Sequence, residues 1–201
     1  MPYIIHPRQL RNMVAGLFGA ALLIGAVPAV ASAACPSSPA TAALAQFGDT
    51  AAYTLLSGSS FESGAPGWSL TRAEVAGDSG ANGGSHSLVI QSNGQAVSPA
   101  FCVSSEYPSF RFFARQVNSG GWGSALNVSL RWTDIYGFSH DTRVASLQPA
   151  GSWELSPVLR LAGALPLWMP GSTLAVRLVF QPSYEGGAWA IDDVFIDPYR
   201  R

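Results

Sequence analysis

The sequence contains no lysine, only two cysteines and only three histidines in 201 residues. Charged residues make up 11% of the chain, against about a quarter in an average globular protein. All eleven basic residues are arginines, and with twelve acidic residues they give a formal net charge of −1. A chain without a basic excess lacks the electrostatic footprint for nucleic-acid phosphates, so we expect no nucleic-acid partner. The 48% of apolar residues excludes an intrinsically disordered chain.

The first 33 residues have the pattern of an export signal. Residues 1–12 carry Arg8 and Arg11 and no acid, residues 13–30 form an apolar run, and residues 31–33 are the small-x-small sequence that signal peptidase recognises. We predict cleavage after Ala33, which leaves nine arginines against twelve acids and a net charge of −3. The alternative is an uncleaved anchor, because the run approaches the roughly 18 residues that span a membrane. After cleavage we expect a secreted protein without a membrane segment.

Export makes the two cysteines, Cys35 and Cys102, readable as one disulfide, because secreted proteins keep cysteines paired. The bridge would tie an arm rich in alanine, serine and proline, residues 34–50, to the rest of the chain. The alternative is a lipoprotein in which Cys35 is acylated and Cys102 stays free. A lipobox has a large aliphatic residue three positions before the cysteine, where this chain has Ser32.

Beyond residue 50, apolar residues recur with a period of two. Residues 109–117, 126–133 and 173–180 alternate in this way, as strands with one buried face do. Shorter candidates, separated by turn-forming residues, lie at 53–56, 68–75, 85–91, 96–103, 142–147, 153–159 and 189–196. About ten strands predict an all-β fold, an antiparallel jelly-roll β-sandwich, over residues 51–201. Residues 159–168 are the one segment for which we expect a short helix.

Three segments carry a family resemblance. They are Ser60-Phe61-Glu62-Ser63-Gly64 followed by Gly67-Trp68, then Gly84-Ser85-His86-Ser87-Leu88, and finally Ile191-Asp192-Asp193-Val194. In this order they resemble the opening, third-strand and closing motifs of secreted jelly-roll modules of the galactose-binding-like and carbohydrate-binding-module type. The resemblance spans residues 60–196 and implies a binding module.

The resemblance also implies one structural Ca²⁺, held by the glutamate of the opening motif and an aspartate of the closing motif. In this chain these are Glu62 and either Asp192 or Asp193. Strand parity places Asp192 on the inward side with Val194, where an unpaired carboxylate is costly and a hard cation would satisfy it. Asp193 would then face solvent. The alternative is that Asp192 caps a turn or accepts backbone N–H groups in the loop before Glu62.

No motif predicts catalysis. The tetrapeptide at residues 77–80 copies the sequence around the nucleophile of trypsin-like proteases, but only His6 precedes Ser79, and His6 belongs to the export signal. We therefore expect a turn there. The remaining histidines are too few for a catalytic metal site, and the acids form no recognisable pair for glycoside hydrolysis. We predict that the protein is not an enzyme.

Two sets of side chains are candidates for ligand binding. The first lies on the polar sides of predicted strands and, if these share one sheet, lines one outer face: Arg111, Phe113, Arg115, Asn127, Arg131, Arg143 and Arg177. Guanidinium groups pair with carboxylates or phosphates, and a flat ring stacks on a sugar. The alternative is a solvated face whose arginines pair with neighbouring acids. The second set comprises the loop aromatics Trp122 and Tyr184, which either bind ligand or fold back over the core.

We predict from these features a secreted, non-catalytic module that binds extracellular glycan or a cell-envelope polymer. The alternative is a structural or adhesion module whose partner is a cell-surface protein.

Overall fold

A computed structural model describes residues 39–77, 79–103, 109–134, 136–148, 150–161, 164–165, 174–184 and 187–197. The predicted export signal, its cleavage site and Cys35 lie outside these residues. In the described part of the chain, no helix is long and apolar enough to cross a membrane. Cys102 is buried and is not a free thiol, and its pairing with Cys35 stays a prediction.

Almost all regular structure in the described residues is strand. The elements are a 3-10 helix η1 (Ala45–Phe47) and the strands β1 (Thr54–Leu55), β2 (Ser69–Ala76), β3 (Ser87–Val97), β4 (Phe101–Val103), β5 (Ser109–Gln116), β6 (Leu126–Thr133), β7 (Ser139–Leu147), β8 (Glu154–Leu155), β9 (Leu159–Arg160), β10 (Leu174–Pro182) and β11 (Trp189–Asp197). The predicted all-β class is confirmed.

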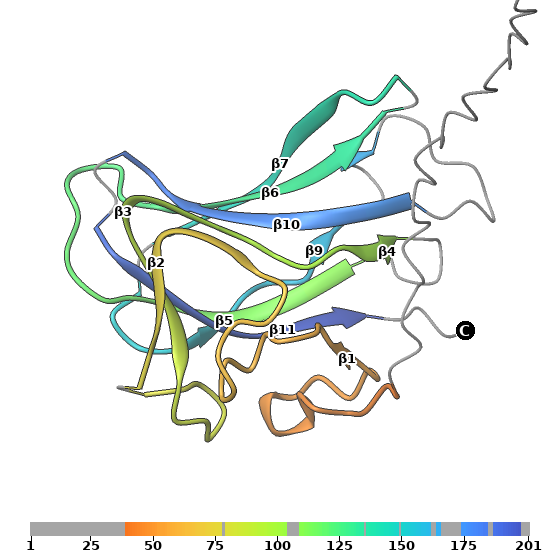
Figure 1. Cartoon of the computed structure of the whole chain (residues 1–201). Coiled ribbons are helices and arrows are strands. Elements are labelled where there is room, and N and C mark those ends of the chain that lie inside the picture. Colours follow the sequence, from red (N-terminus) through yellow and green to blue (C-terminus); the bar gives the residue numbers. More distant parts are fainter. Residues whose placement is uncertain are drawn as a thin grey trace, which may run out of the picture. The chain divides into compact units, whose positions relative to one another are not determined.

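The strands form one antiparallel sheet that curls into two layers. Its order is β7-β6-β10-β3-β11-β5-β8, with β2 beside β3, β4 beside β10, β1 beside β11 and β9 beside β5. Strand β3 belongs to both layers, because Leu88 and Ile90 pair with β11 whereas Ala96 and Val97 pair with β10. We call the two halves the β6–β10 layer and the β5–β11 layer (Figure 1).

The bend between the layers has a local cause. The register of β2 against β3 shifts between Thr71 and Ala73, and Arg72 between them has a positive φ of 50°. On the partner strand Asn93 has a φ of 60°, and a Cβ on Gly94 would lie 2.6 Å from the carbonyl oxygen of Arg72. Bulges of this kind bend a strand and increase its twist. The bend lets β3 run continuously from Ser87 to Val97, across residues 92–95, where the sequence predicts a break. The predicted strand 96–103 is divided between the end of β3 and β4.

The main core lies between the two layers and confirms the predicted alternation. Its fully buried side chains come from alternate positions of β5, β6, β10 and β11: Phe110, Phe112, Leu126, Val128, Leu130, Val176, Leu178, Phe180 and Ile191. Across the layers, the rings of Phe112 and Phe180 meet edge to face with centroids 5.0 Å apart. The opposite sides of these strands are therefore the two outer faces of the sandwich.

The two outer faces differ in what covers them. The segment that precedes β1 packs on the β5–β11 layer, where Leu44 and Tyr53 form a second buried cluster with Phe113 and Phe195. The ring of Phe47 in η1 stands edge to face with Phe113 at 5.1 Å. The described part of the predicted arm is thus a cover for one sheet face.

The prediction of a short helix over residues 159–168 is wrong for its first two residues. Leu159 and Arg160 form β9, which pairs with Ser109 and Phe110 of β5. Leu159 is buried in the main core, so sheet pairing and burial outweigh the local helical pattern. Residues 162–163 and 166–168 lie outside the described part.

Candidate functional site

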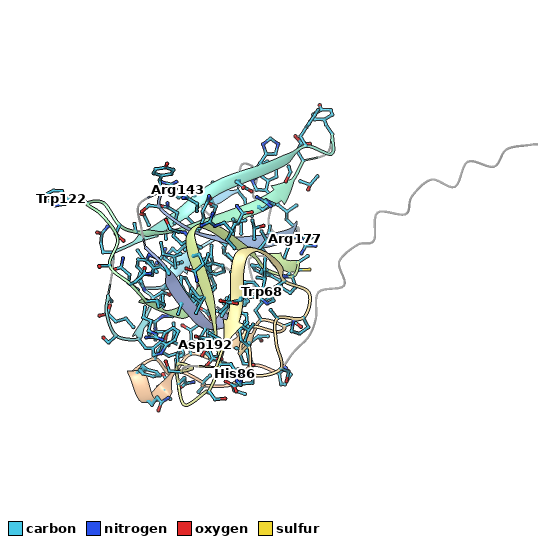
Figure 2. All side chains as sticks on the ribbon, turned by 60° about the vertical axis from the view of Figure 1, so that its left-hand side comes forward. Trp68, His86, Trp122, Arg143, Arg177 and Asp192 are labelled. Atoms are coloured by element: carbon cyan, nitrogen blue, oxygen red, sulfur yellow. The ribbon has the colours of Figure 1, made fainter. Side chains whose placement is uncertain are left out.

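The predicted metal ligands lie together at one end of the sandwich. Glu62 precedes β2, Asp192 and Asp193 lie in β11, and a loop over residues 79–86 connects β2 to β3. Figure 2 shows Asp192 and His86 at this end of the domain, and Trp122 projecting elsewhere. The three carboxylates are close enough for Glu62 to raise the pKa of both aspartates.

A bulge changes the predicted orientation of Asp192. The register of β11 against β5 shifts between Asp192 and Phe195, and Asp193 has a φ of 45°. Asp192 therefore lies opposite Phe113 on the outer side of the β5–β11 layer, whereas Val194 is buried in the main core. The prediction that Asp192 and Val194 share an inward face is wrong, and so is the prediction that Asp193 faces solvent, since Asp193 is half-buried. Asp192 is still only 1% exposed.

Hydrogen bonds and burial set the charges of this cluster. Asp192 accepts the N–H of Ala81 at 2.7 Å and the N–H of Asp193 at 2.8 Å. Its backbone donors thus lie in the β2–β3 loop and in β11, whereas the alternative interpretation placed them in the loop before Glu62. Burial, then the charges of Asp193 and Glu62, nonetheless raise the pKa of Asp192 to about 7. Hydrogen bonds from Ser85 and His86 lower the pKa of Glu62 to about 2.

Oxygen atoms of Glu62, Ala81 and Asp192 lie around Gly84, and each of them also accepts a backbone N–H. A Cβ on Gly84 would lie 2.7 Å from Oε1 of Glu62, 3.3 Å from the carbonyl oxygen of Ala81 and 3.6 Å from Oδ2 of Asp192. Three oxygens therefore surround a space that a side chain at position 84 would fill. The described residues contain no group of three His, Cys, Asp or Glu side chains that could hold a metal ion. A cation would need two carboxylates together with backbone carbonyls, a donor set that suits Ca²⁺.

A buried hydroxyl beside this cluster also lacks a partner. Ser87 is fully buried, and its Oγ makes no hydrogen bond with the described residues. Ser87 directly precedes Leu88, which pairs with Ile191, the neighbour of Asp192. An unpaired buried hydroxyl is costly, so the surroundings of Asp192 contain polar atoms in need of a further partner. The cluster brings together Glu62 and Asp192, the two carboxylates that the family resemblance assigns to Ca²⁺, and the binding of Ca²⁺ stays a prediction.

The predicted row of arginines is divided between the two layers. Arg111, Phe113 and Arg115 belong to β5, on the covered face, whereas Arg131, Arg143 and Arg177 belong to β6, β7 and β10. The expectation of a single arginine-lined face is therefore wrong. Alternation shows on which side of a strand a residue lies, but β3 and β11 separate β5 from β10 in the sheet.

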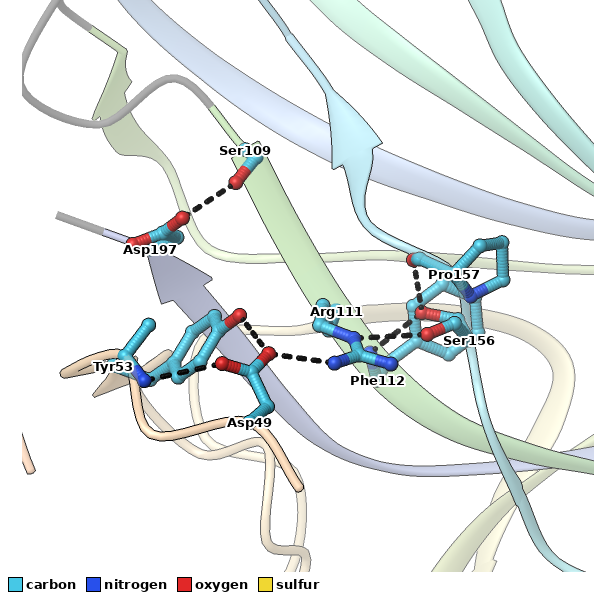
Figure 3. A network of polar contacts seen from close by, with 9 residues as sticks. Asp49, Tyr53, Ser109, Arg111, Phe112, Ser156, Pro157 and Asp197 are labelled. Carbon is cyan, nitrogen blue, oxygen red and sulfur yellow. Dashed lines mark hydrogen bonds and ion pairs between the residues drawn. The ribbon is translucent and has the colours of Figure 1, made fainter. Parts of the chain in front are cut away.

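On the covered face, the arginines have structural partners. Nη1 of Arg111 contacts Oδ2 of Asp49 at 2.6 Å, and its Nε donates to the carbonyl oxygen of Ser156 at 3.0 Å (Figure 3). Burial opposes ionisation of Asp49, but hydrogen bonds from Tyr53, Ala51 and Arg111 outweigh it and lower its pKa. The guanidinium carbon of Arg115 lies 5.1 Å from the centre of the Trp153 ring.

Phe113 is likewise a structural residue. It is 3% exposed, beneath Phe47. The prediction that its ring stacks on a ligand is wrong, because the segment before β1 occupies that place.

The outer face of the β6–β10 layer is polar and carries three rows of side chains, fixed by the strand register. The first row consists of Ser146, Asn127 and Gln181, which lie opposite one another on β7, β6 and β10, and of Gln95 and Thr71, which pair on β3 and β2. The pairing of β10 with β3 brings the two parts together, since Phe180 lies opposite Ala96, one residue from Gln181 and Gln95. The second row is Arg143, Ser129, Val179, Val97 and Ser69. The third row is Asp141, Arg131 and Arg177. Asn127 and the three arginines were predicted from the sequence as ligand-binding candidates, but Gln181 and Gln95 were not. The only sequence feature that could have identified the two glutamines is their place on the polar side of an alternating strand.

The three arginines of this face differ in their partners. Arg131 binds Asp141 through two hydrogen bonds of 2.7 Å, from Nε to Oδ1 and from Nη2 to Oδ2. Nη1 of Arg177 donates to the carbonyl oxygen of Ser98 at 2.9 Å. Arg143 is exposed and makes no hydrogen bond or ion pair with any described residue. The sequence left open that these arginines pair with neighbouring acids. Among the described residues of this face, only Arg131 does so.

Exposed aromatic rings lie in the loops at the end of β6 and β10 that is nearest the first row. Trp122 is 103% exposed and Tyr184 is 80% exposed, so neither folds back over the core. Their loops are joined, because the N–H of Ser183 donates to the carbonyl oxygen of Ala125 at 2.8 Å. Gln181 lies three residues before Tyr184 and, in the register, opposite Asn127. Trp122 projects from the domain in Figure 2.

A second pair of exposed rings stands at the other end of β6. Tyr136 and Phe138 are 79% and 67% exposed in the turn between β6 and β7. Asp134 holds this turn, accepting the N–H groups of both residues at 2.9 Å. These rings lie at the end of β6 that is far from the first row. They can therefore be substituted as controls for the rings near the first row.

No protein-family model matches the sequence, and no curated protein is similar enough in sequence to match it. Solved structures do match. The family 22 xylan-binding domain of Paenibacillus barcinonensis Xyn10C has a TM-score of 0.53 at 15% identity, over 74% of this chain and 97% of that chain.

Two further structures agree. The tandem of family 22 domains from the same Xyn10C has a TM-score of 0.54 at 16% identity, over 74% of this chain and 46% of that chain. Another family 22 xylan-binding domain has a TM-score of 0.51 at 15% identity, over 75% of this chain and 96% of that chain. The fold is a jelly roll of the carbohydrate-binding-module type. At these identities the likeness shows the fold alone, and the site has to be argued from its own residues.

Proposed function

We propose that the protein is a secreted, non-catalytic module that binds extracellular glycan on the outer face of the β6–β10 layer. The observation that carries the proposal is the set of amide side chains on this face, Asn127, Gln181 and Gln95, at the end of the strands where the loops carry the exposed rings of Trp122 and Tyr184. Side-chain amides donate and accept hydrogen bonds, as sugar hydroxyls do, and a flat ring covers the apolar face of a sugar.

The neighbours in fold support a glycan as the ligand, because their names describe them as xylan-binding domains. We further propose that one Ca²⁺ binds between Glu62 and Asp192 in a structural role. The support is the set of oxygens around Gly84 and the buried hydroxyl of Ser87. A cation there would link the loop before β3 to β11 and so hold the cover of the β5–β11 layer in place.

Affinity gel electrophoresis with soluble xylan, mixed-linked β-glucan, mannan and polygalacturonate tests the glycan proposal. We expect the wild type to be retarded by at least one polymer. The double substitution Trp122→Ala and Tyr184→Ala removes both exposed rings and should weaken that binding about tenfold or more.

The matched control is Phe138→Ala, which removes an exposed ring at the opposite end of β6. It should leave retardation unchanged. Wild-type protein that none of the polymers retards would refute the proposed function. A loss confined to Phe138→Ala would place the site at the wrong end of the sheet.

A further inference from the structure

The outer face of the β6–β10 layer carries uncompensated positive charge. Asp141 is the only acid of its three rows, and the two hydrogen bonds to Arg131 use both of its carboxylate oxygens. Arg177 has only a neutral carbonyl as a partner, and Arg143 has none among the described residues. Two positive charges therefore remain on this face of a chain whose formal net charge is −1.

The described acids elsewhere do not compensate these charges. Glu62, Asp192 and Asp193 gather at the end of the β5–β11 layer, and Asp49 is paired with Arg111 beneath the cover. Asp134 is paired with His140 at the tip of the β6–β7 turn. The remaining described acids belong to the other half of the sheet: Glu74 lies opposite Val89 in the part of β3 beside β11, Glu154 lies opposite Ala114 of β5, and Asp197 accepts a hydrogen bond from Ser109. The open face is thus a local exception to the negative balance of the chain.

The register places Arg143 and Arg177 on the same face of the sheet, two strands and two residues apart. Arg143 lies opposite Ser129, which lies opposite Val179, and Arg177 stands two residues from Val179 on β10. With strands about 4.8 Å apart and about 3.4 Å per residue, the two Cα atoms are about 12 Å apart. Ser129 and Val179 lie on one side of the line between them, and Arg131 with its partner Asp141 lies on the other. A ligand chain that crosses this patch would meet both guanidinium groups.

The same face shows the type of ligand group that its arginines accept. Arg131 binds the carboxylate of Asp141 through two parallel hydrogen bonds of 2.7 Å. Such a planar fork matches a carboxylate and gives specificity as well as attraction. Arg143 offers the same fork one row away, without an acid of its own.

We propose that this face selects glycans that carry carboxylate groups, with Arg143 and Arg177 pairing with the carboxylates of uronic acid residues. The inference rests on the proposed function and names the ligand class of that same site. The amide row and exposed rings hold the neutral part of the chain, and the two arginines add the preference for acidic residues.

Isothermal titration compares two xylans, one neutral and one substituted with glucuronic acid, with two other polyanions, polygalacturonate and inorganic polyphosphate. We expect the wild type to bind the acidic xylan at least tenfold more tightly than the neutral xylan in low salt. The advantage should shrink as salt rises, because screening weakens exposed charge pairs.

The variants Arg143→Gln and Arg177→Gln should each lose at least fivefold in affinity for the acidic xylan while keeping their affinity for the neutral one. Arg160→Gln is the matched control, because Arg160 is an exposed arginine of β9 in the other layer. It makes the same change in net charge and should leave both affinities unchanged. Melting temperatures within a few degrees of the wild type would show that the variants fold.

Equal affinity for neutral and acidic xylan would overturn the inference and leave the proposed function standing. A preference for polyphosphate without binding to either uronic acid polymer would also overturn it. An equal loss in Arg160→Gln would show attraction by overall charge and refute the role of the two arginines. Absence of binding to every polymer would instead refute the proposed function.

Discussion

The two outer faces of this sandwich start from the same strand pattern and end in different roles. Both carry arginines on the polar side of an alternating strand, Arg111 on β5 and Arg143 on β7. The segment before β1 covers the first face, so Arg111 becomes a partly buried partner of Asp49. Nothing in the described residues pairs with Arg143. A polar strand face is thus a candidate site only where no other segment packs on it.

The β5–β11 layer needs the segment before β1 as a cover because its outer face carries large apolar side chains. On the β5–β11 layer, Phe113, Phe195 and Tyr53 are buried although they lie outside the main core. The open face has buried apolar side chains only at Val97 and Val179, in the middle of its second row. The covered face therefore contributes to folding, and the open face is available for a ligand.

The largest expected effect comes from Phe113→Ala. Removing this ring leaves a cavity beneath the cover and should lower the free energy of unfolding by about 3–5 kcal/mol. Urea denaturation measures the change. Ser129→Ala, on the open face, is the control and should shift the free energy by no more than about 0.5 kcal/mol. Equal losses in the two variants would contradict the division into a structural and a binding face.

The next effect concerns the cation at the edge of the cover. At pH 8, Ca²⁺ at a hundred times its dissociation constant should raise the stability by about 2.7 kcal/mol, seen as a higher melting temperature than with chelator. Asp192→Asn should lose this gain. A melting temperature that Ca²⁺ does not change at pH 8 would rule out the site.

The same carboxylate predicts a pH dependence in the chelated protein. Because the folded-state pKa of Asp192 is raised from 3.8 to about 7, the folded chain holds this proton more tightly than the unfolded chain. Stability should therefore fall as the pH rises from about 4 to about 7. The lowered pKa of Glu62 acts only below this window. Asp192→Asn should flatten the melting temperature across the window, and an unchanged slope would contradict the assignment.

Much of the fold was predictable because its strands have one buried side. The alternation at residues 109–117, 126–133 and 173–180 corresponds to β5, β6 and β10. The continuation of β3 through residues 92–95 was not predictable, because Asn93 and Gly94 have the composition of a turn but form a bend within a strand. The orientation of Asp192 was lost for a related reason, since a bulge at Asp193 reverses strand parity.

The candidate site was predictable only in part. Asn127, Arg143, Arg177, Trp122 and Tyr184 were identified from their place on polar strand sides or in glycine-rich loops. Sequence periodicity cannot tell which sheet layer a strand joins, so Arg111, Arg115 and Phe113 were assigned to the same face. Their separation depends on pairing between distant strands and on a cover of about fifteen residues, neither of which leaves a local pattern.

An NMR titration of the side-chain amides tests the division of the two faces most directly. The ligand is a xylo-oligosaccharide that carries glucuronic acid, added to uniformly labelled protein. The account predicts that the amide signals of Asn127, Gln181 and Gln95 shift, whereas the backbone signals of Phe113 and Tyr53 stay in place. Shifts confined to the β5–β11 layer, with the three amides unchanged, would contradict it.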